Sequence, residues 1–219
     1  MTSLSWQRAK FLCFGICIGT FLCSSSAAEL ISLGTGQKVV DACVFNVTKD
    51  NARMFWRSSS GAVLGTFDRI KEDLQSSGER LYCASNAGIY GKDLHPIGLY
   101  VQTGKVERKL NLRKDGYGNF YMQPNGVFLL SQNKAAIMTT DEVQSNWEII
   151  IGTLRYATQS GPLMLQAGQI NSAFTPGSSN RVLRNAVCTK SSTDVALVKS
   201  RTPINFYDFS QVLRDELGC

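Results

Sequence analysis

Four short polar segments, at the ends of apolar stretches typical of strands, carry the residues in this sequence that could do chemistry. Loops held by a rigid sheet are where binding and catalytic groups are usually found. The candidate binding residues in these segments are Asn86 and Gly88, Asn125 and Gly126, Gln159, Ser160 and Gly161, and Arg184 and Asn185. Taken singly, each segment is also an ordinary turn, because Asn-Gly and Ser-Gly are common turn dipeptides.

The residue types in these segments bear on the kind of chemistry. The guanidinium of Arg184, with no acidic neighbour close in sequence, suits a phosphate or carboxylate ligand, and a salt bridge to a distant acid is the alternative. Nucleophilic catalysis has little support, because Ser160 lies outside any Gly-x-Ser-x-Gly elbow and His95 is the sole histidine. Since no Cys-x-x-Cys motif is present either, we expect no metal and no cofactor.

The beginning of the chain has the pattern of a secretory signal. Arg8 and Lys10 precede an apolar run over Phe11–Leu22, and small residues occupy the −3 and −1 positions of a cleavage site after Ala28. The run is shorter than the roughly 20 residues that a membrane span needs. We therefore predict a signal peptide over residues 1–28 and a periplasmic or secreted protein with no membrane span after cleavage.

The remaining residues, 29–219, are enough for one domain with a core of its own. Loss of Arg8 and Lys10 lowers the formal net charge by two, from +6 to +4. No cluster of Lys and Arg with interleaved aromatic residues is present, so nucleic acid is not an expected partner. A lipoprotein anchor on Cys23 is the alternative to cleavage, but Leu22 is bulky where such signals usually have a small residue.

The cysteines of residues 29–219 are Cys43, Cys83, Cys188 and Cys219. An even number in an exported chain permits disulfides, and four cysteines allow three connectivities. We predict a disulfide between Cys43 and Cys219, which would join the two ends of the domain and constrain a long loop. Cys83 and Cys188 would then be small buried apolar residues inside strands.

The hydrophobic pattern predicts mainly strands and turns. Strands or hairpins are predicted at residues 38–47, 52–56, 80–88, 97–112, 118–141, 162–170 and 181–200. Helices are predicted over residues 67–78, after a capping box from Thr139 to Glu142, and from Asn205 to a stop at Gly218. Because strands come in runs, we expect an α+β fold: a single domain with a mixed, mostly antiparallel sheet and a few short helices.

Taken together, these segments resemble the bacterial branch of the phosphodiester glycosidase family, whose better-known member is the lysosomal uncovering enzyme, N-acetylglucosamine-1-phosphodiester α-N-acetylglucosaminidase. The resemblance extends from about Val40 to Cys219 and is carried by SNAGIYGKDL, YMQPNGVFLL, RYATQSGPLMLQAG, SNRVLRNAV and INFYDFSQVLRDELGC. It implies hydrolysis of the bond between a sugar's anomeric carbon and a phosphate. The implied partner is a sugar phosphodiester or an envelope glycan.

The resemblance also implies roles for the candidate residues. Arg184 would neutralise phosphate charge. Asn86, Ser160 and Asn185 would donate hydrogen bonds to phosphate or sugar hydroxyls, an arrangement of dipoles that stabilises developing charge. The other members of the matching loops are Gly88, Asn125, Gly126, Gln159 and Gly161.

The sequence identifies no catalytic residue. Glycosidic cleavage usually needs a carboxylic acid and a carboxylate, and Asp93, Glu142 and Asp208, the nearest acids, are better explained as surface or capping groups. In relatives the Leu-Gly-Cys motif continues into a strand that carries an aspartate, whereas this sequence stops at Cys219. We therefore expect a domain over 29–219 that is truncated at its C-terminus, either an exported hydrolase or a non-catalytic relative that binds sugar phosphates.

Overall fold

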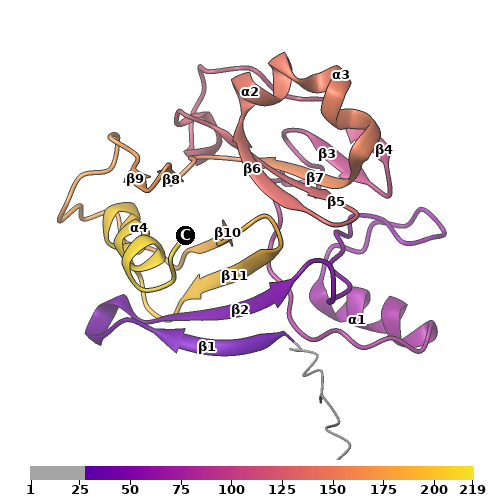
Figure 1. Ribbon diagram of the computed structural model, residues 1–219, viewed down its shortest axis with the longest axis horizontal. Helices are drawn as coiled ribbons and strands as arrows, with labels where there is room; N and C mark the ends of the chain where they lie inside the picture. The colour runs from indigo at the N-terminus through magenta and orange to yellow at the C-terminus, as the bar shows by residue number, and fades with distance from the viewer. Residues whose placement is uncertain (1–27) are drawn as a thin grey trace, which may run out of the picture.

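A computed structural model describes residues 28–219, so the predicted signal peptide lies, apart from its last residue, outside the described residues. Two antiparallel sheets face each other, and helices cover their outer faces (Figure 1). The prediction of an α+β fold with mostly antiparallel strands is confirmed. None of the helices in the described range has the length and apolar character needed to span a bilayer.

The four-stranded sheet has the order β1-β2-β11-β10, and all of its neighbouring strands are antiparallel. Its strands are β1 (Glu29–Leu33), β2 (Val40–Asn46), β10 (Asn185–Thr189) and β11 (Asp194–Ser200). Helix α4 (Phe206–Asp215) packs on one face of this sheet, and the side chain of Asn205 caps its first turn by accepting from the Asp208 N–H. Because β10 is last in the strand order, it forms one edge of this sheet.

The five-stranded sheet has the order β4-β3-β7-β5-β6 and is also antiparallel throughout. Its strands are β3 (Tyr100–Gln102), β4 (Lys105–Arg108), β5 (Gly126–Ser131), β6 (Ala135–Thr139) and β7 (Leu154–Ser160). Two short helices, α2 (Thr140–Ser145) and α3 (Trp147–Ile150), pack on its outer face. The remaining elements are α1 (Phe67–Ser76), the hairpin β8 (Leu165–Gln166) and β9 (Gln169–Ile170), and the 3-10 turns η1 (Gly36–Lys38), η2 (Asn119–Tyr121) and η3 (Ile151–Thr153).

Alternation along β5 shows how the layers are held together. Val127 and Leu129 point outward and pack with Val143 of α2. Phe128 and Leu130 point inward and pack with β11 of the other sheet. Because successive side chains of a strand point to opposite faces, a single buried strand contributes to both hydrophobic layers. The order of layers is therefore α4, four-stranded sheet, five-stranded sheet, and α2 with α3.

Most predicted elements are present, and two are not. The predicted strands over residues 52–56 and 80–88 are wrong, because neither segment joins a sheet in the described structure. Both lie in the long connections on either side of α1, and the only β pairing within residues 47–89 is an isolated bridge between Arg57 and Val63. None of the residues in either segment is buried, and Tyr82 is 60% exposed, so their aromatic residues mark the surface of these connections and not a strand ladder.

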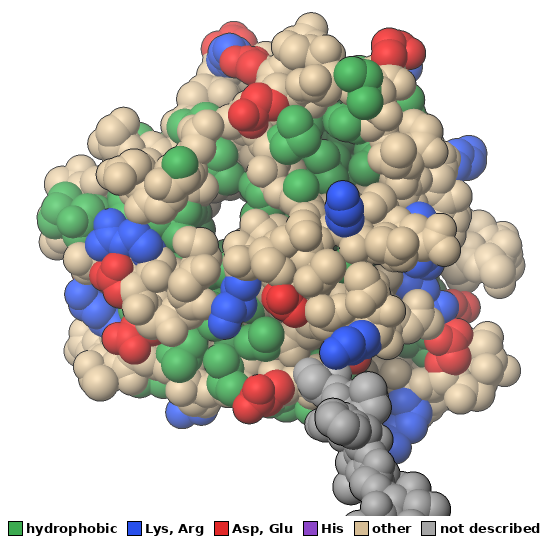
Figure 2. Space-filling model, viewed as in Figure 1, with side chains coloured by type: hydrophobic (Ala, Val, Ile, Leu, Met, Phe, Trp, Pro, Cys, Tyr) green, Lys and Arg blue, Asp and Glu red, His purple; other side chains and the backbone are tan. Residues whose placement is uncertain are grey.

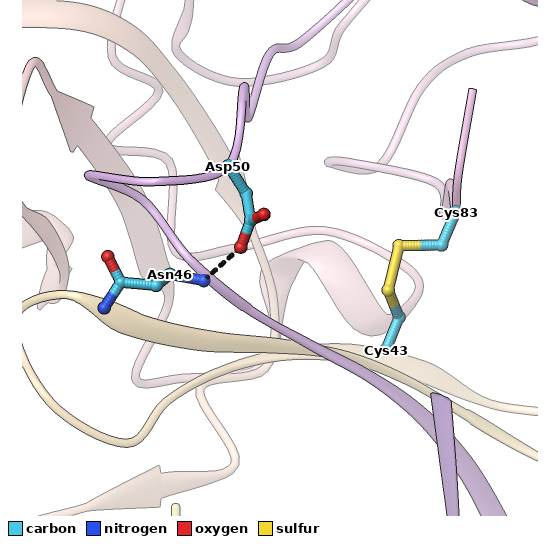
Figure 3. Close-up of a disulfide and its surroundings, with 4 residues drawn as sticks. All are labelled: Cys43, Asn46, Asp50 and Cys83. Carbon is cyan, nitrogen blue, oxygen red and sulfur yellow. Dashed lines mark hydrogen bonds between the residues drawn. A yellow bond between two sulfur atoms is a disulfide. The ribbon is translucent and has the colours of Figure 1, made fainter. Parts of the chain in front are cut away.

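The predicted disulfide between Cys43 and Cys219 is also wrong. Cys43 pairs with Cys83, and Cys188 pairs with Cys219. Ala42 of β2 packs toward α4, so the next side chain, Cys43, points to the opposite face of the sheet and cannot reach the end of that helix. Figure 3 shows Cys43 on β2 bonded to Cys83, close to the turn in which the N–H of Asn46 donates to Asp50 Oδ2 at 2.8 Å.

Candidate functional site

A cleft of about 790 Å³ lies where the edge strands of the two sheets, β6 and β10, approach each other. Figure 2 shows an opening at this position, beside hydrophobic side chains. We call it the central cleft; it is bounded by residues 86–90, the ends of β5, β6 and β7, residues 161–168, β10, and Phe206, Leu213 and Cys219. The four polar segments singled out in the sequence thus reach one place in the fold.

The floor of the central cleft is one end of the five-stranded sheet. Gly126 of β5 lies opposite Ser160 of β7 on one side and Thr139 of β6 on the other. Two residues further along, Phe128 lies between Thr158 of β7 and Ile137 of β6. All six residues line the cleft. The glycine at the centre of the outer row lies beneath the side chain of Leu163, since a Cβ at Gly126 would be 3.2 Å from Leu163 Cδ1, and residues with hydroxyl groups lie on both sides of it.

One wall of the central cleft is held by Asn185, the first residue of β10. Its Nδ2 donates to Ser85 Oγ at 2.9 Å and lies 3.4 Å from the carbonyl oxygen of Asn86. The Asn86 side chain in turn donates from Nδ2 to the Tyr90 hydroxyl at 3.1 Å. These hydrogen bonds join segment 85–90 to the four-stranded sheet, so Asn86 and Asn185, far apart in sequence, lie side by side at the cleft.

The same segment is packed directly on β7 through Gly88. A Cβ atom at Gly88 would overlap the hydroxyl of Thr158 and the carbonyl oxygen of Gln159. A side chain at this position would therefore push the segment away from the sheet. Gly161 is equally constrained, since a Cβ there would lie only 2.8 Å from the carbonyl oxygen of Phe120. These glycines shape the cleft by allowing close approach of backbone to backbone.

Gln159 faces away from the central cleft and is only 1% exposed. Its Oε1 accepts from the N–H groups of Leu99 and Asn111, both at 2.9 Å. Its Nε2 donates to Asn111 O at 2.7 Å and to Asn125 Oδ1 at 3.1 Å. Asn125 is likewise buried and donates from Nδ2 to the carbonyl oxygen of Phe120. Both amides are hydrogen-bonded inside the protein and position β7 and the turn before β5.

Arg184 lies behind the wall of the central cleft and not in its lining. Its Nε donates to Ile204 O at 2.7 Å, and one terminal nitrogen donates to the carbonyl and side-chain oxygens of Asn180. The guanidinium carbon lies 3.6 Å from the ring centroid of Phe206, which does line the cleft. Burial lowers the pKa of Arg184. The structure gives this arginine no carboxylate partner among the described residues.

Glu142 is the one charged side chain among the described residues that line the central cleft. Its Oε2 accepts from the N–H and hydroxyl of Thr139 at 2.7 and 2.8 Å, which completes the predicted capping box of α2. The backbone hydrogen bond from Thr139 is the main cause that lowers the pKa of Glu142. The carboxylate is therefore ionised at neutral pH, and its Oε1 makes no hydrogen bond within the described residues.

Comparison with known proteins places this geometry in a family. The phosphodiester glycosidase family matches residues 79–219, a range that contains every described residue lining the central cleft. The uncharacterized protein YigE of Escherichia coli strain K12 is 32% identical over 192 residues, which cover 88% of this chain and 73% of YigE. The chain belongs to the phosphodiester glycosidase family. No solved structure gives a significant match.

In this member of the phosphodiester glycosidase family, the sequence motifs identified the segments that form the central cleft, but they did not identify every residue that lines it. Of the nine predicted binding residues, the cleft brings together Asn86, Gly88, Gly126, Ser160, Gly161 and Asn185. It leaves out Asn125, Gln159 and Arg184, which lie behind it. Thr158 and Phe128 were missed, although they follow from the alternation that starts at Ser160 and Gly126.

The other acids near the motifs do not reach the central cleft. Asp93 pairs with His95 at 3.2 Å, and Asp208 pairs with Lys38 at 3.1 Å and with Arg181 at 3.3 Å. None of them lines the cleft. Within residues 28–219, no cluster of three or more His, Cys, Asp or Glu side chains is arranged to hold a metal ion.

Proposed function

We propose that the protein hydrolyses sugar-1-phosphodiesters in the central cleft, releasing a free sugar and a phosphomonoester. The observation that carries this proposal is the convergence of separate family segments on one cleft, whose lining includes the hydroxyl group of Ser160 and the amide groups of Asn86 and Asn185. Such groups can hydrogen-bond both sugar hydroxyls and phosphate oxygens. The cleft volume of about 790 Å³ suits a ligand of this size.

The chemistry of the leaving group fits a cleft with one carboxylate. Water adds to the anomeric carbon, the bond from that carbon to the phosphate oxygen breaks, and the phosphomonoester departs with the bonding electrons. A phosphate monoester is already a stable anion at neutral pH, because its second pKa is about 6. The leaving group therefore does not require the carboxylic acid that ordinary glycosidases supply.

Glu142 is the group that we assign to activation of the attacking water. A general base must be ionised and within hydrogen-bond reach of the water. The hydrogen bonds from Thr139 keep the Glu142 carboxylate ionised and use only Oε2, so that Oε1 is available to the cleft. The proton taken from water then resides on this carboxylate until it is lost to solvent.

The remaining cleft residues hold the substrate in this proposal. Ser160, Asn86 and Asn185 donate hydrogen bonds to sugar or phosphate oxygens. Arg184 acts from behind the wall of the cleft, by fixing the Phe206 ring, which is held between its guanidinium and the stacked ring of Phe174, and by adding positive charge close to the phosphate. We propose Arg184 as a positioning residue, because it contacts Phe206, which lines the cleft, and does not line the cleft itself.

The test is turnover of an N-acetylglucosamine-1-phosphate methyl ester, followed by phosphorus NMR and by detection of free sugar. Glu142→Gln is the decisive variant, because glutamine also satisfies a capping box and preserves the fold. We expect kcat to fall at least about a hundredfold, the usual contribution of general base catalysis, with little change in binding. Unchanged kcat in Glu142→Gln would exclude the assigned role.

A test of the proposed role of Arg184 needs a measurement of ligand binding in addition to one of protein stability. We expect Arg184→Met to weaken binding of the phosphodiester more than binding of free N-acetylglucosamine, because only the diester carries charge. Equal losses for the two ligands would contradict a role toward phosphate. Calorimetry of both ligands on the same folded variant makes the comparison independent of expression level.

A second function is favoured by the single acidic side chain in the described lining. Ordinary glycosidases use two carboxyl groups, so a non-catalytic relative that binds sugar phosphates is the alternative. Binding of the methyl ester without release of free sugar would identify this alternative. Export is part of both proposals, since the predicted signal peptide and two disulfides suit an oxidising compartment.

A further inference from the structure

A second and larger cavity, of about 930 Å³, lies beside the central cleft. It lies between the facing sides of the two sheets, and the long connections around α1 form its outer wall. We call it the aromatic chamber, because its lining includes the rings of Phe45, Phe55, Trp56, Phe67, Tyr82 and Tyr90. A cavity with this many rings has the lining expected of a site for an apolar ligand.

Exposed apolar side chains gather at the aromatic chamber. Phe67 is 47% exposed, Tyr82 is 60% exposed and Tyr90 is 48% exposed, and all of them line it. Leu94, 39% exposed, is a fourth. Single exposed apolar residues are ordinary on a protein surface, but a group of them around one cavity marks an interaction site.

The aromatic chamber and the central cleft share a wall. Residues 86–90, Phe128, Thr158 and Val187 line both. Tyr90 therefore borders both cavities, and its hydroxyl accepts from Asn86, at the polar side of the wall. Because this segment is hydrogen-bonded to β10 and packed on β7, a ligand held in the central cleft reaches the chamber over the outer side of the segment, where Asn86, Ala87 and Tyr90 are exposed. The two cavities differ in character, since the floor of the cleft presents hydroxyl groups and the chamber presents rings. Charged residues also line the chamber, and two of them, Arg53 and Glu79, pair with each other: Asp50, Arg53, Asp68, Glu79 and Arg80.

We propose that the aromatic chamber binds an apolar chain esterified to the phosphate of the substrate. The substrate class is then a sugar phosphodiester with a sugar on one side and a lipid-like alkyl group on the other. This inference rests on the proposed function, because the sugar end must occupy the central cleft. A phosphodiester has two substituents, and the two adjoining cavities provide one polar and one apolar environment for them.

The walls of the aromatic chamber come partly from outside the family match. Phe45, Phe55, Trp56 and Phe67 all precede residue 79, where the match to the phosphodiester glycosidase family begins. The central cleft, by contrast, is built wholly from matched residues. The chamber is thus a feature that can set substrate preference while the reaction in the cleft stays the same.

The test compares two esters of N-acetylglucosamine-1-phosphate, methyl and octyl, by calorimetry on the full chain below the concentration at which the octyl ester forms micelles. We expect the octyl ester to bind at least about tenfold tighter, since burial of only two methylene groups already accounts for this factor. Equal affinities for the two esters would overturn the inference and leave the proposed function intact. Failure of both esters to bind would overturn the proposed function together with the inference.

The double variant Phe67→Ser and Tyr82→Ser tests whether the octyl chain of the ester binds in the aromatic chamber. Both side chains are exposed, line the aromatic chamber and are absent from the central cleft. We expect this variant to bind the methyl ester as the wild type does and to lose most of the preference for octyl. Tyr117→Ser is the matched control, because Tyr117 is fully exposed and lines neither cavity. An octyl preference that survives in the double variant would also overturn the inference.

Discussion

Replacement of Gln159 by leucine tests whether the buried amide holds the central cleft in shape. Leucine has a similar volume but no polar atoms, so the N–H groups of Leu99 and Asn111 lose the acceptor they share, and Asn111 O and Asn125 Oδ1 lose their donor. The Leu99 N–H has no route to water, since that residue is fully buried. The change therefore leaves polar groups unpaired without creating a large cavity.

The magnitude follows from these partners. An unpaired buried donor or acceptor costs about 1–3 kcal/mol, and groups of one network share part of that cost. Asn111 is partly exposed and can recover some hydrogen bonds from water. We expect Gln159→Leu to lower the free energy of unfolding by about 3 kcal/mol, most of it from Leu99.

Urea unfolding at neutral pH measures this change. The matched control is Ser160→Ala, the next residue, whose hydroxyl faces the central cleft and makes no hydrogen bond within the described residues; its effect should stay within about 0.5 kcal/mol. A loss below about 1 kcal/mol for Gln159→Leu, at an unchanged denaturant slope, would refute the reasoning.

Three further changes test other parts of the account. Gly88→Ala should destabilise by about 1–3 kcal/mol and weaken ligand binding, because its Cβ overlaps β7, whereas Gly152→Ala, which meets open space, should be neutral in both measurements. Removal of the Cys188–Cys219 disulfide by a double serine variant should cost about 4 kcal/mol in urea unfolding, since it closes 31 residues; no loss would mean that the bond is absent. The lowered pKa of Glu142 means that its capping contribution is present above its ordinary pKa of 4.5 and is lost as the pH falls through the lower folded value. The stability difference between wild type and Glu142→Gln should therefore be constant near neutral pH and change only in acid; a change near pH 7 would contradict this assignment.

The sequence predicted correctly those features of the fold that depend on residues close together in the chain. The capping box of Thr139 and Glu142, the cap at Asn205 and the hairpin turns depend on residues a few positions apart, and all are present. The strand predicted over 80–88 failed because the segment is attached to the sheets without joining a ladder, through the disulfide of Cys83 with β2 and the close approach of Gly88 to β7. Pairing is decided by partners that are distant in sequence.

In the candidate site, too, the sequence predicted what depends on neighbouring residues and missed what depends on the tertiary structure. Motifs placed Ser160 and Gly161 at the central cleft, but Gln159 belongs to the opposite face because side chains alternate along β7. The same alternation excludes a bond from Cys43 to Cys219 once the face toward α4 is known. Arg184 could not be placed from sequence, since only the tertiary structure shows that it contacts Phe206 and does not line the cleft itself.

The most direct test of the central claim is an NMR titration of the isotope-labelled protein with N-acetylglucosamine-1-phosphate methyl ester. We predict saturable shifts of the amide signals of Gly126, Ser160 and Gly161 at the floor of the central cleft, and of Asn86 and Asn185 at its wall, with Tyr117 as an unaffected reference. Absence of shifts at millimolar ligand, or shifts confined to residues outside the central cleft, would contradict the assignment of this cleft as the sugar-phosphodiester site.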